Sequence, residues 1–209
     1  MDSLPEHLLP GRAAPLGAHV VDGGVQFAVF SQRAKQIELC IFDSTGTQEL
    51  KRYALHPTED GVFSGVLPNA QPGLIYGYRA HGSYKPESGY RFNPHKLLLD
   101  PYAREIVGRF EWRPEHFAYV HGHPEGARVL DTRDNAAFAL KSRVTAPAAP
   151  ASRTAQRQRR PLSEVVLYEL HVKGFTMTLP GIPDALRGTY AALAHPAAIA
   201  HLKRLGVTT

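Results

Sequence analysis

The sequence predicts a mainly β fold, a β-sandwich followed by the first βα unit of a parallel α/β array. Between residues 23 and 80, short segments of alternating apolar and polar residues recur about every ten residues, separated by turn residues. From residue 162 onward, a continuous apolar run precedes a segment with helical periodicity, which is the order of a βα unit. Of the 209 residues, 43% are hydrophobic and 21% charged, a composition typical of a globular protein with a buried core.

Each predicted strand of the sandwich has one apolar face. Val25, Phe27 and Val29 alternate with Gln26 and Ala28, which is the two-residue period of a strand buried on one side. Turn sequences rich in Gly, Asp and Asn separate this segment from similar ones. The predicted strands are residues 25–29, 37–41, 47–55, 62–67 and 74–80.

Between residues 81 and 143 the sequence is rich in turns, and we expect ordered loops that cover neighbouring structure. Residues 96–106 fit one short helical turn broken at Pro101, and residues 134–144 fit a short extended piece. Residues 146–161 are rich in Ala, Pro and Arg, which predicts a flexible linker. The predicted domains are residues 1–110, the sandwich; residues 111–161, connecting loops and linker; and residues 162–209, the start of a barrel.

The last predicted domain opens with a strand and a helix. Residues 165–171 begin with three consecutive apolar residues, which favours a strand covered on both faces. Residues 196–205 are expected to form a helix, with Pro196 at its first position and Gly206 just past its end. Because a parallel strand needs parallel neighbours, we expect a truncated barrel, with the apolar faces of this strand and helix exposed.

The charge, the apolar runs and the cysteine content bear on the partners and the location of the chain. The net charge is +5, but four arginines fall in residues 153–160 without a basic helix or aromatic platform, so no nucleic-acid partner is expected. We also expect no membrane partner, because no apolar run reaches the length of a membrane span and the N-terminus lacks a secretory signal. Cys40 lies in an apolar strand pattern, which favours a buried inert thiol and fits a cytoplasmic location.

No motif points to a metal, a cofactor or a catalytic triad. His121 and His123 lie two residues apart on a glycine-rich loop, without a second pair of ligands at metal-binding spacing. The sequence contains no Gly-x-Ser-x-Gly motif and no phosphate-binding glycine motif ahead of a helix. We therefore predict no cofactor, no metal site and no triad.

Sugar binding is the activity that the residues themselves support. Pyranose rings stack on exposed aromatic side chains, because their C–H faces are apolar while their hydroxyls need polar partners. The candidates are Tyr76, Tyr78, Tyr84, Tyr90 and Trp112. Tyr76 and Tyr78 share one strand face, and core packing is the favoured role for both. Tyr84 and Trp112 lie in loop-like sequence, so we predict them as substrate-binding residues.

Seven segments, taken in chain order, match one known family, and together they span nearly the whole chain except residues 146–161. They are residues 15–18, 24–31, 37–43, 72–82, 91–103, 167–176 and 187–196. Residues 91–103 read Arg-Phe-Asn-Pro-His-Lys-Leu-Leu-Leu-Asp-Pro-Tyr-Ala, and residues 167–176 read Leu-Tyr-Glu-Leu-His-Val-Lys-Gly-Phe-Thr. On these segments the chain resembles the glycogen debranching enzymes of the GlgX/isoamylase type, in the α-amylase superfamily.

This resemblance implies an immunoglobulin-like N-terminal domain of the carbohydrate-binding module family 48 type, packed on a (β/α)8 TIM barrel. It also implies hydrolysis of α-1,6 branch linkages in glycogen or limit dextrins by an aspartate nucleophile and a glutamate acid/base. In relatives these carboxylates lie on later barrel strands, so no catalytic residue is assigned in this chain, which we expect to be inactive by itself. Glu169 and His171, on one face of the first barrel strand, are expected to be structural.

Other interpretations of the same sequence stay open. One is a free-standing α-glucan-binding module without enzymatic activity. Another is a different isoamylase of the same superfamily, and a third is a truncated gene product with no function of its own. In the first two of these, glycogen or another branched α-glucan is the expected partner.

Overall fold

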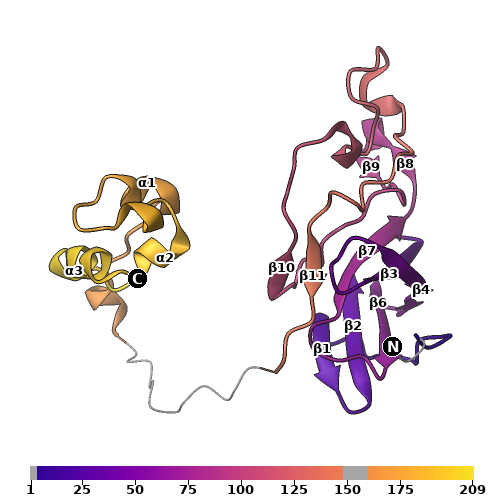
Figure 1. Cartoon of the computed structure of the whole chain (residues 1–209), viewed down its shortest axis with the longest axis horizontal. Coiled ribbons are helices and arrows are strands. Elements are labelled where there is room, and N and C mark those ends of the chain that lie inside the picture. The colour runs from indigo at the N-terminus through magenta and orange to yellow at the C-terminus, as the bar shows by residue number, and fades with distance from the viewer. Residues whose placement is uncertain (1–3, 148–159) are drawn as a thin grey trace. The chain divides into compact units, whose positions relative to one another are not determined.

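The computed structural model describes residues 4–147 and 160–209. It divides the chain into two units, Met1–Ala149 and Pro150–Thr209, which are described separately below (Figure 1). The linker predicted over residues 146–161 lies mostly outside the described residues, so its flexibility stays a prediction.

The first unit is built from β-strands joined by turns and short 3-10 segments (Figure 1). The strands are β1 Gly17–Val21, β2 Gly24–Phe30, β3 Gln36–Phe42, β4 Glu49–Ala54, β5 His56–Pro57, β6 Val62–Pro68, β7 Ile75–His81, β8 Tyr84–Lys85, β9 Tyr90–Arg91, β10 Glu105–Val107 and β11 Lys141–Arg143. The five predicted strands correspond to β2, β3, β4, β6 and β7 and are confirmed. Strand β1 precedes the region in which strands were predicted.

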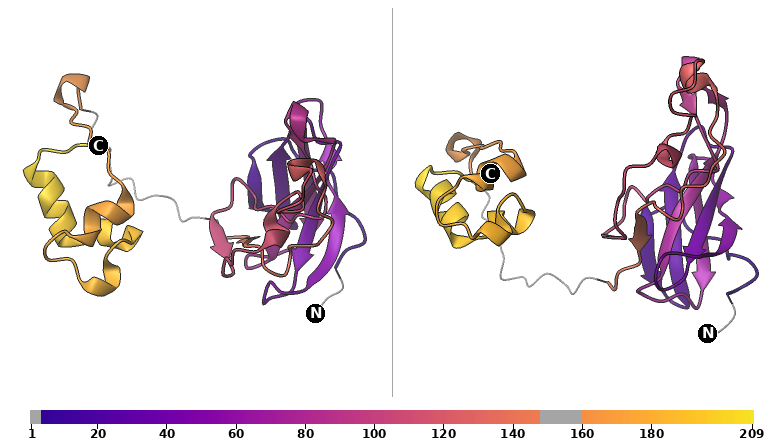
Figure 2. Two further views of the ribbon diagram at one scale, coloured as in Figure 1. Left: turned by 90° about the horizontal axis from the view of Figure 1, so that it is seen from above. Right: turned by 45° about the horizontal axis from the view of Figure 1, so that its top comes forward.

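Two antiparallel sheets form a sandwich, seen from two further directions in Figure 2. One sheet has the strand order β1-β2-β6-β5, and the other has the order β10-β11-β7-β3-β4. Strand β2 pairs with β6 along its whole length, and β3 pairs with β7 in the same way. The short strands β8 and β9 form a separate hairpin. The predicted mainly β, immunoglobulin-like sandwich is therefore confirmed.

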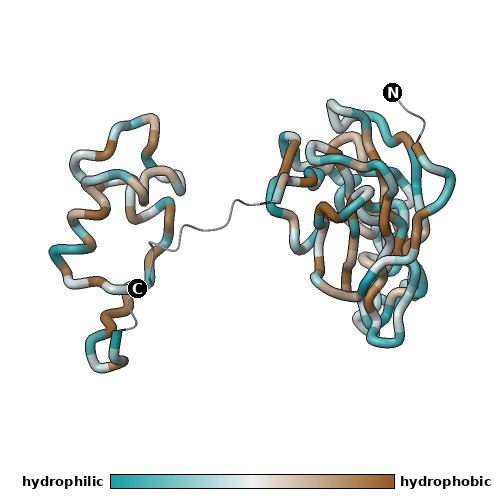
Figure 3. The backbone as a smooth tube through the Cα atoms, turned by 90° about the horizontal axis from the view of Figure 1, so that it is seen from below, coloured by the Kyte–Doolittle hydropathy of each residue, from teal (hydrophilic) through white to brown (hydrophobic). Residues whose placement is uncertain are grey.

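The main core lies between the two sheets. Phe27 on β2 and Leu39 on β3 are fully buried, as predicted, but the alternate positions Ala28 and Cys40 are fully buried too, so these strands are covered on both faces and not on one. Tyr76 and Tyr78 on β7 are also in this core, only 1% and 3% exposed, and the ring of Tyr76 packs edge-on against Phe27 at a centroid distance of 5.0 Å. The predicted core role of both tyrosines is confirmed. Figure 3 shows how hydrophobic and hydrophilic residues alternate along the chain.

A second apolar cluster covers the outer face of the larger sheet. Cys40 and Ile75 on that face pack with Leu97 and Ala136 from two long loop segments. Gly77 allows the close approach, because a β-carbon at this position would lie 2.9 Å from Leu97 Cδ1 and 3.1 Å from the backbone oxygen of Leu98. Loop residues after residue 110 are thus packed on the sandwich, and residues 141–143 add a strand to it.

The helical turn expected within residues 96–106 is wrong. Leu98 instead forms an antiparallel bridge with Tyr78, with backbone N–H···O distances of 2.9 and 2.8 Å. Residues 105–107 form strand β10. Two contacts hold the chain extended. One is the bridge with Tyr78, and the other is the hydrogen bond from Leu97 N–H to the Asn135 side-chain oxygen at 2.6 Å. The extended piece expected in residues 134–144 is confirmed as β11.

The second unit contains helices α1 Val172–Met177, α2 Tyr190–Leu193 and α3 Pro196–Arg204 (Figure 1). Ile182, Ala192 and Ala198 form its small buried core. Helix α3 confirms the predicted helix, including Pro196 at its start and Gly206 beyond its end at a φ of 74°. None of the helices that the structure describes is long and apolar enough to cross a membrane.

The strand predicted at residues 165–171 is wrong as a strand, and the start of a TIM barrel is not confirmed. The segment is extended, and its backbone groups at Val166 and Tyr168 bond to Thr208 and Thr209 at distances of 2.9–3.2 Å. Within residues 160–209 no further segment pairs with it, so the regular ladder of a buried strand does not form. Leu167 is 76% exposed, which agrees with the expectation that the apolar side chains of this segment are uncovered.

Candidate functional site

An exposed aromatic pair follows strand β10. The indole of Trp112 is 80% exposed, and its ring meets Phe110 edge-on at a centroid distance of 5.0 Å. Phe110 in turn stacks on the imidazole of His116 at 4.9 Å with an interplanar angle of 25°. These three rings, here called the Trp112 cluster, present aromatic faces to solvent on one loop.

Local interactions hold the loop of the Trp112 cluster in shape. Pro114 opens a 3-10 turn that places His116 back beside Phe110. The His116 side chain bonds to the carbonyl oxygen of Glu111 at 2.9 Å, and since a carbonyl only accepts, Nε2 carries the proton. The guanidinium of Arg113 lies 4.2 Å from the ring centre of Phe138, which ties the loop to the rest of the unit. The aromatic faces are therefore positioned by the fold.

Tyr84, the other predicted sugar-binding residue, lies on the β8–β9 hairpin. It is partly buried, and its hydroxyl donates to the carbonyl oxygen of Ala127 at 2.6 Å. Burial raises the pKa of this phenol above its ordinary value. The side chain keeps some exposure, but its hydroxyl is already engaged. Its interactions are separate from those of Trp112, so the structure gives the two predicted residues different surroundings.

Tyr76 and Tyr90 have structural partners. The Tyr76 hydroxyl donates to Asp100 at 2.6 Å, and burial raises the pKa of this phenol strongly. Tyr90 on β9 lies under the guanidinium of Arg33, at 5.1 Å from the ring centre. Of the five aromatic candidates, Trp112 has the largest exposed face, which makes it the one best placed to stack on a sugar.

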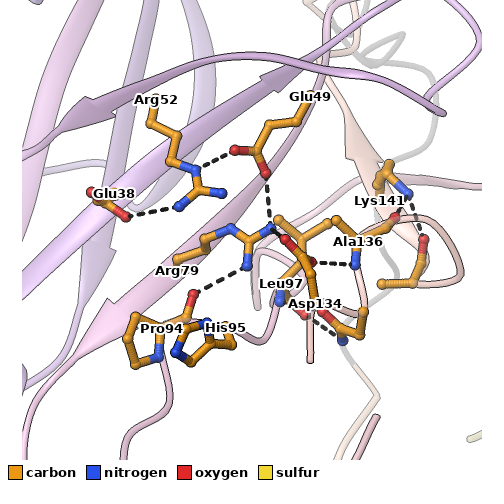
Figure 4. A network of polar contacts seen from close by, with 12 residues as sticks. Glu38, Glu49, Arg52, Arg79, Pro94, His95, Leu97, Asp134, Ala136 and Lys141 are labelled. Atoms are coloured by element: carbon orange, nitrogen blue, oxygen red, sulfur yellow. Dashed lines mark hydrogen bonds and ion pairs between the residues drawn. The ribbon is translucent and has the colours of Figure 1, made fainter. Parts of the chain in front are cut away.

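A buried ionic network supports the loops that carry these residues (Figure 4). Arg79 on β7 is 1% exposed and donates to Glu49 at 2.9 Å, to Asp134 at 2.8 Å and to the carbonyl oxygen of Pro94 at 3.1 Å. Asp134 is thereby bound to the sheet, and hydrogen bonds and the guanidinium charge hold the pKa of its carboxyl below the ordinary value despite burial. The network fixes the loop layer on the outer face of the sheet.

A second network reaches the Trp112 cluster itself. The carboxylate of Asp131 is 1% exposed, lies 3.4 Å from the Lys96 ammonium and accepts hydrogen bonds from Arg133. These interactions, above all the Arg133 side chain, lower the pKa of Asp131 to about 2. Arg133 also pairs with Glu115 at 3.0 Å, and Glu115 is adjacent to His116. The aromatic loop is therefore linked to a buried charge pair.

Residues 15–103 match carbohydrate-binding module 48, the isoamylase N-terminal domain. Module 48 thus covers the sandwich from β1 to just before β10. The Trp112 cluster lies outside the matched residues, whereas Tyr84 lies within them.

Solved structures show the same fold. The apo pullulanase from Paenibacillus barengoltzii is similar over 93% of this chain, with 18% identity and a TM-score of 0.54. The catalytic module of the glycogen-degrading pneumococcal virulence factor SpuA is similar over 95%, with 24% identity and a TM-score of 0.56. The GBS pullulanase SAP, solved with maltotetraose, is similar over 96%, with 21% identity and a TM-score of 0.56. The chain spans 26%, 26% and 24% of these structures, about a quarter of each.

The residues weighed for catalysis have other surroundings. Glu169 and His171 are exposed, and His171 Nδ1 accepts the N–H of Gly174 at 3.0 Å, which caps helix α1. The predicted burial of Cys40 is confirmed, and burial raises the pKa of its thiol to about 12, which disfavours the thiolate that a nucleophile needs. Within residues 4–147 and 160–209, no group of three His, Cys, Asp or Glu residues is placed to hold a metal ion.

Sequence reasoning missed Phe110 and His116. Phe110 was not among the candidates, although it lies two residues before Trp112 in the same loop. The paired aromatic residues at 110 and 112 are the signal that points to it. His116 has no signal of its own, because the 3-10 turn that returns it to Phe110 is a property of the folded loop.

Proposed function

We propose that this chain is the N-terminal part of a glycogen debranching enzyme of the GlgX/isoamylase type, which hydrolyses α-1,6 branch linkages in glycogen or limit dextrins. The observation that carries the proposal is the match of residues 15–103 to the isoamylase N-terminal domain on a two-sheet sandwich. The fold shared with pullulanases and with a glycogen-degrading protein supports it. We also propose a cytoplasmic location for the enzyme, because the single cysteine in this chain is a free, buried thiol, which fits a reducing compartment.

In this proposal the catalytic carboxylates belong to barrel strands that follow residue 209. Retaining hydrolysis needs two carboxyl groups about 5–5.5 Å apart, one as nucleophile and one as acid/base. Glu169 is exposed, and the proposal gives it no catalytic role. With those strands beside it, the extended segment 165–171 gains the parallel neighbours that a first barrel strand needs, and the sandwich packs on that barrel.

The role proposed for the first unit is contact with the α-glucan. Trp112 offers an exposed aromatic face for a pyranose ring, and Tyr84 offers a partly buried one. No metal or cofactor is part of this proposal. The exposure of Trp112 also favours the alternative, a free-standing α-glucan-binding module, because such a module needs an accessible aromatic platform and no carboxylate pair.

Two assays on the purified 209-residue chain test these roles. In affinity electrophoresis, we expect glycogen in the gel to retard the chain, and dextran to leave its mobility unchanged. In a reducing-sugar assay with a branched limit dextrin, we expect no release of reducing ends. Hydrolysis by the chain would overturn the assignment of catalysis to residues beyond 209.

The reading frame decides between the proposal and its alternative. If the gene continues past the codon for Thr209 into strands that carry an aspartate and a glutamate, the debranching enzyme is supported. A stop codon at that point, together with retention by glycogen, would favour the free-standing binding module.

A further inference from the structure

A cleft of about 460 Å³ lies next to the Trp112 cluster. It is lined by residues from the end of β2, from the second half of β7, from residues 89–101 and by His116. Its volume lies within the range of about 300–1,000 Å³ that is usual for small-molecule sites. His116 belongs both to this cleft and to the Trp112 cluster, so the two features are continuous.

The walls of the cleft are apolar and partly exposed. Phe30, the last residue of β2, is 53% exposed, and Leu98 is 46% exposed. Phe92 forms another part of the wall, and a β-carbon at Gly82 would lie only 2.4 Å from its ring. The glycine therefore permits the position of this ring. Leu98 is held by its two backbone hydrogen bonds to Tyr78. The apolar surface is thus preformed.

Polar groups at the cleft differ in whether their hydrogen-bond donors are already engaged within the chain. Asn93 and Lys96 are buried, and their donors are taken up by the carbonyl oxygens of Ala118 and Arg133 at 2.9 and 2.7 Å. Ser31 and Arg91 also line the cleft. Within residues 4–147 and 160–209, the Ser31 hydroxyl and the Arg91 guanidinium make no side-chain hydrogen bond or ion pair. These two groups are able to donate to a ligand.

This combination suits a sugar chain. Pyranose units present apolar C–H faces and a rim of hydroxyls, and the cleft offers apolar walls with a hydroxyl and a guanidinium beside them. A polypeptide partner would be expected to need a larger apolar surface than a concavity of this size. Outside the cleft, Phe110 and Trp112 continue as exposed rings on which further pyranose units can stack.

We propose that this cleft binds a short α-glucan segment, with its C–H faces against Phe30 and Leu98 and its hydroxyls bonded to Ser31 and Arg91. The same glucan chain then passes over His116 and Phe110 to Trp112. The inference rests on the proposed function and deepens it, because it moves the main glucan contact from the single rings of Trp112 and Tyr84 to this cleft.

Chemical-shift mapping of the whole 209-residue chain locates the site directly. With maltotetraose as the probe, we expect the largest amide shifts at Phe30 and Leu98, which line the cleft outside the β8–β9 hairpin, and smaller ones around Trp112. The indole N–H of the single tryptophan gives a separate signal for the outer end of the site. Largest shifts at Tyr84 and its strand partner Arg91, with none at Phe30 and Leu98, would overturn the inference while leaving glucan binding in place.

Matched variants provide the second measurement. Phe30→Ala is expected to weaken maltotetraose binding about tenfold by calorimetry, since one aromatic wall is lost. Leu50→Ala is the control, because Leu50 is similarly exposed, at 44%, but does not line the cleft. Its affinity should equal that of the unsubstituted chain. Both side chains are surface-exposed, so both variants are expected to fold.

The outcomes separate this inference from the proposed function. If glycogen retards the chain and Phe30→Ala binds maltotetraose as well as the unsubstituted chain, the cleft is not the site, but the glucan-binding role stands. If Phe30→Ala changes only the self-association of the chain, the cleft is a protein contact and the inference is overturned. If neither glycogen nor maltotetraose binds, the glucan-binding role fails and the inference fails with it.

Discussion

At the residue scale, Arg79 joins three segments of the first unit. Its guanidinium binds Glu49 from β4, Asp134 from a long loop and the carbonyl oxygen of Pro94 (Figure 4). A buried guanidinium is costly unless its donors are paired, so its removal leaves both carboxylates without their buried partner. Arg79 is therefore one of the contacts that bind the loop layer to the sheet.

Replacing Arg79 is expected to destabilise the first unit. We predict that Arg79→Met lowers the free energy of unfolding by about 2–3 kcal/mol, less than for a fully enclosed pair because the Asp134 side chain is 52% exposed. Arg52→Met, which removes a guanidinium that is 43% exposed, should cost about 1 kcal/mol or less. Urea unfolding of both variants measures the difference. Equal losses would contradict the role given to Arg79.

The carboxyl group of Asp131 gives a pH dependence with a defined sign. Hydrogen bonds from Arg133 lower its pKa from 3.8 to about 2 in the folded chain. A group with a lowered pKa stabilises the fold above its ordinary pKa, and that stabilisation is lost as the pH falls from 3.8 through about 2. We expect Asp131→Asn to be less stable than the unsubstituted chain at neutral pH, but to lose less stability across this window. Urea midpoints at several pH values test this, and parallel pH profiles would contradict it.

At the element scale, Gly77 allows the loop layer to lie on strand β7. A β-carbon at this position would lie 2.9 Å from Leu97 Cδ1, so Gly77→Ala should destabilise the first unit by about 1–3 kcal/mol through overpacking. The double variant Gly77→Ala/Leu97→Ala removes the clashing side chain, and its loss should be smaller than the sum of the two single losses. Strictly additive losses in thermal or urea unfolding would exclude this contact as the cause.

The longer strands were predictable because each carries its own signal. Residues 25–29 and 37–41 alternate with the period of a strand, and each of β2 and β3 pairs with a full-length neighbour. Helix α3 was predictable from Pro196, its apolar spacing and Gly206. In these elements, local pattern and tertiary packing agree.

The short elements were predictable only in part. Strand β11 lies within residues 134–144, where an extended piece was expected, but β10 has only three residues, too few to show a period, and forms because β11, itself paired with β7, accepts it. Residues 165–171 have the composition of a buried strand, but such a strand depends on neighbours that no local pattern supplies. Tertiary partners decide these segments.

At the scale of the whole molecule, each unit has its own buried core. The first unit buries its apolar residues between two sheets, and the second buries Ile182, Ala192 and Ala198 among helices. The candidate site belongs entirely to the first unit. Trp112 could be predicted from its loop-like surroundings, whereas the cleft could not, because its lining comes from segments that are distant in sequence and that only the fold brings together.

The central claim is that the first unit contacts α-glucan through exposed aromatic side chains. Affinity electrophoresis in gels with and without glycogen tests this claim most directly. We predict that glycogen retards the unsubstituted chain, and that Trp112→Ala is retarded several-fold less, as expected when a stacking ring is lost. Tyr84→Phe should behave like the unsubstituted chain, because the Tyr84 hydroxyl is bound to Ala127. Equal mobility of the unsubstituted chain with and without glycogen would contradict the account.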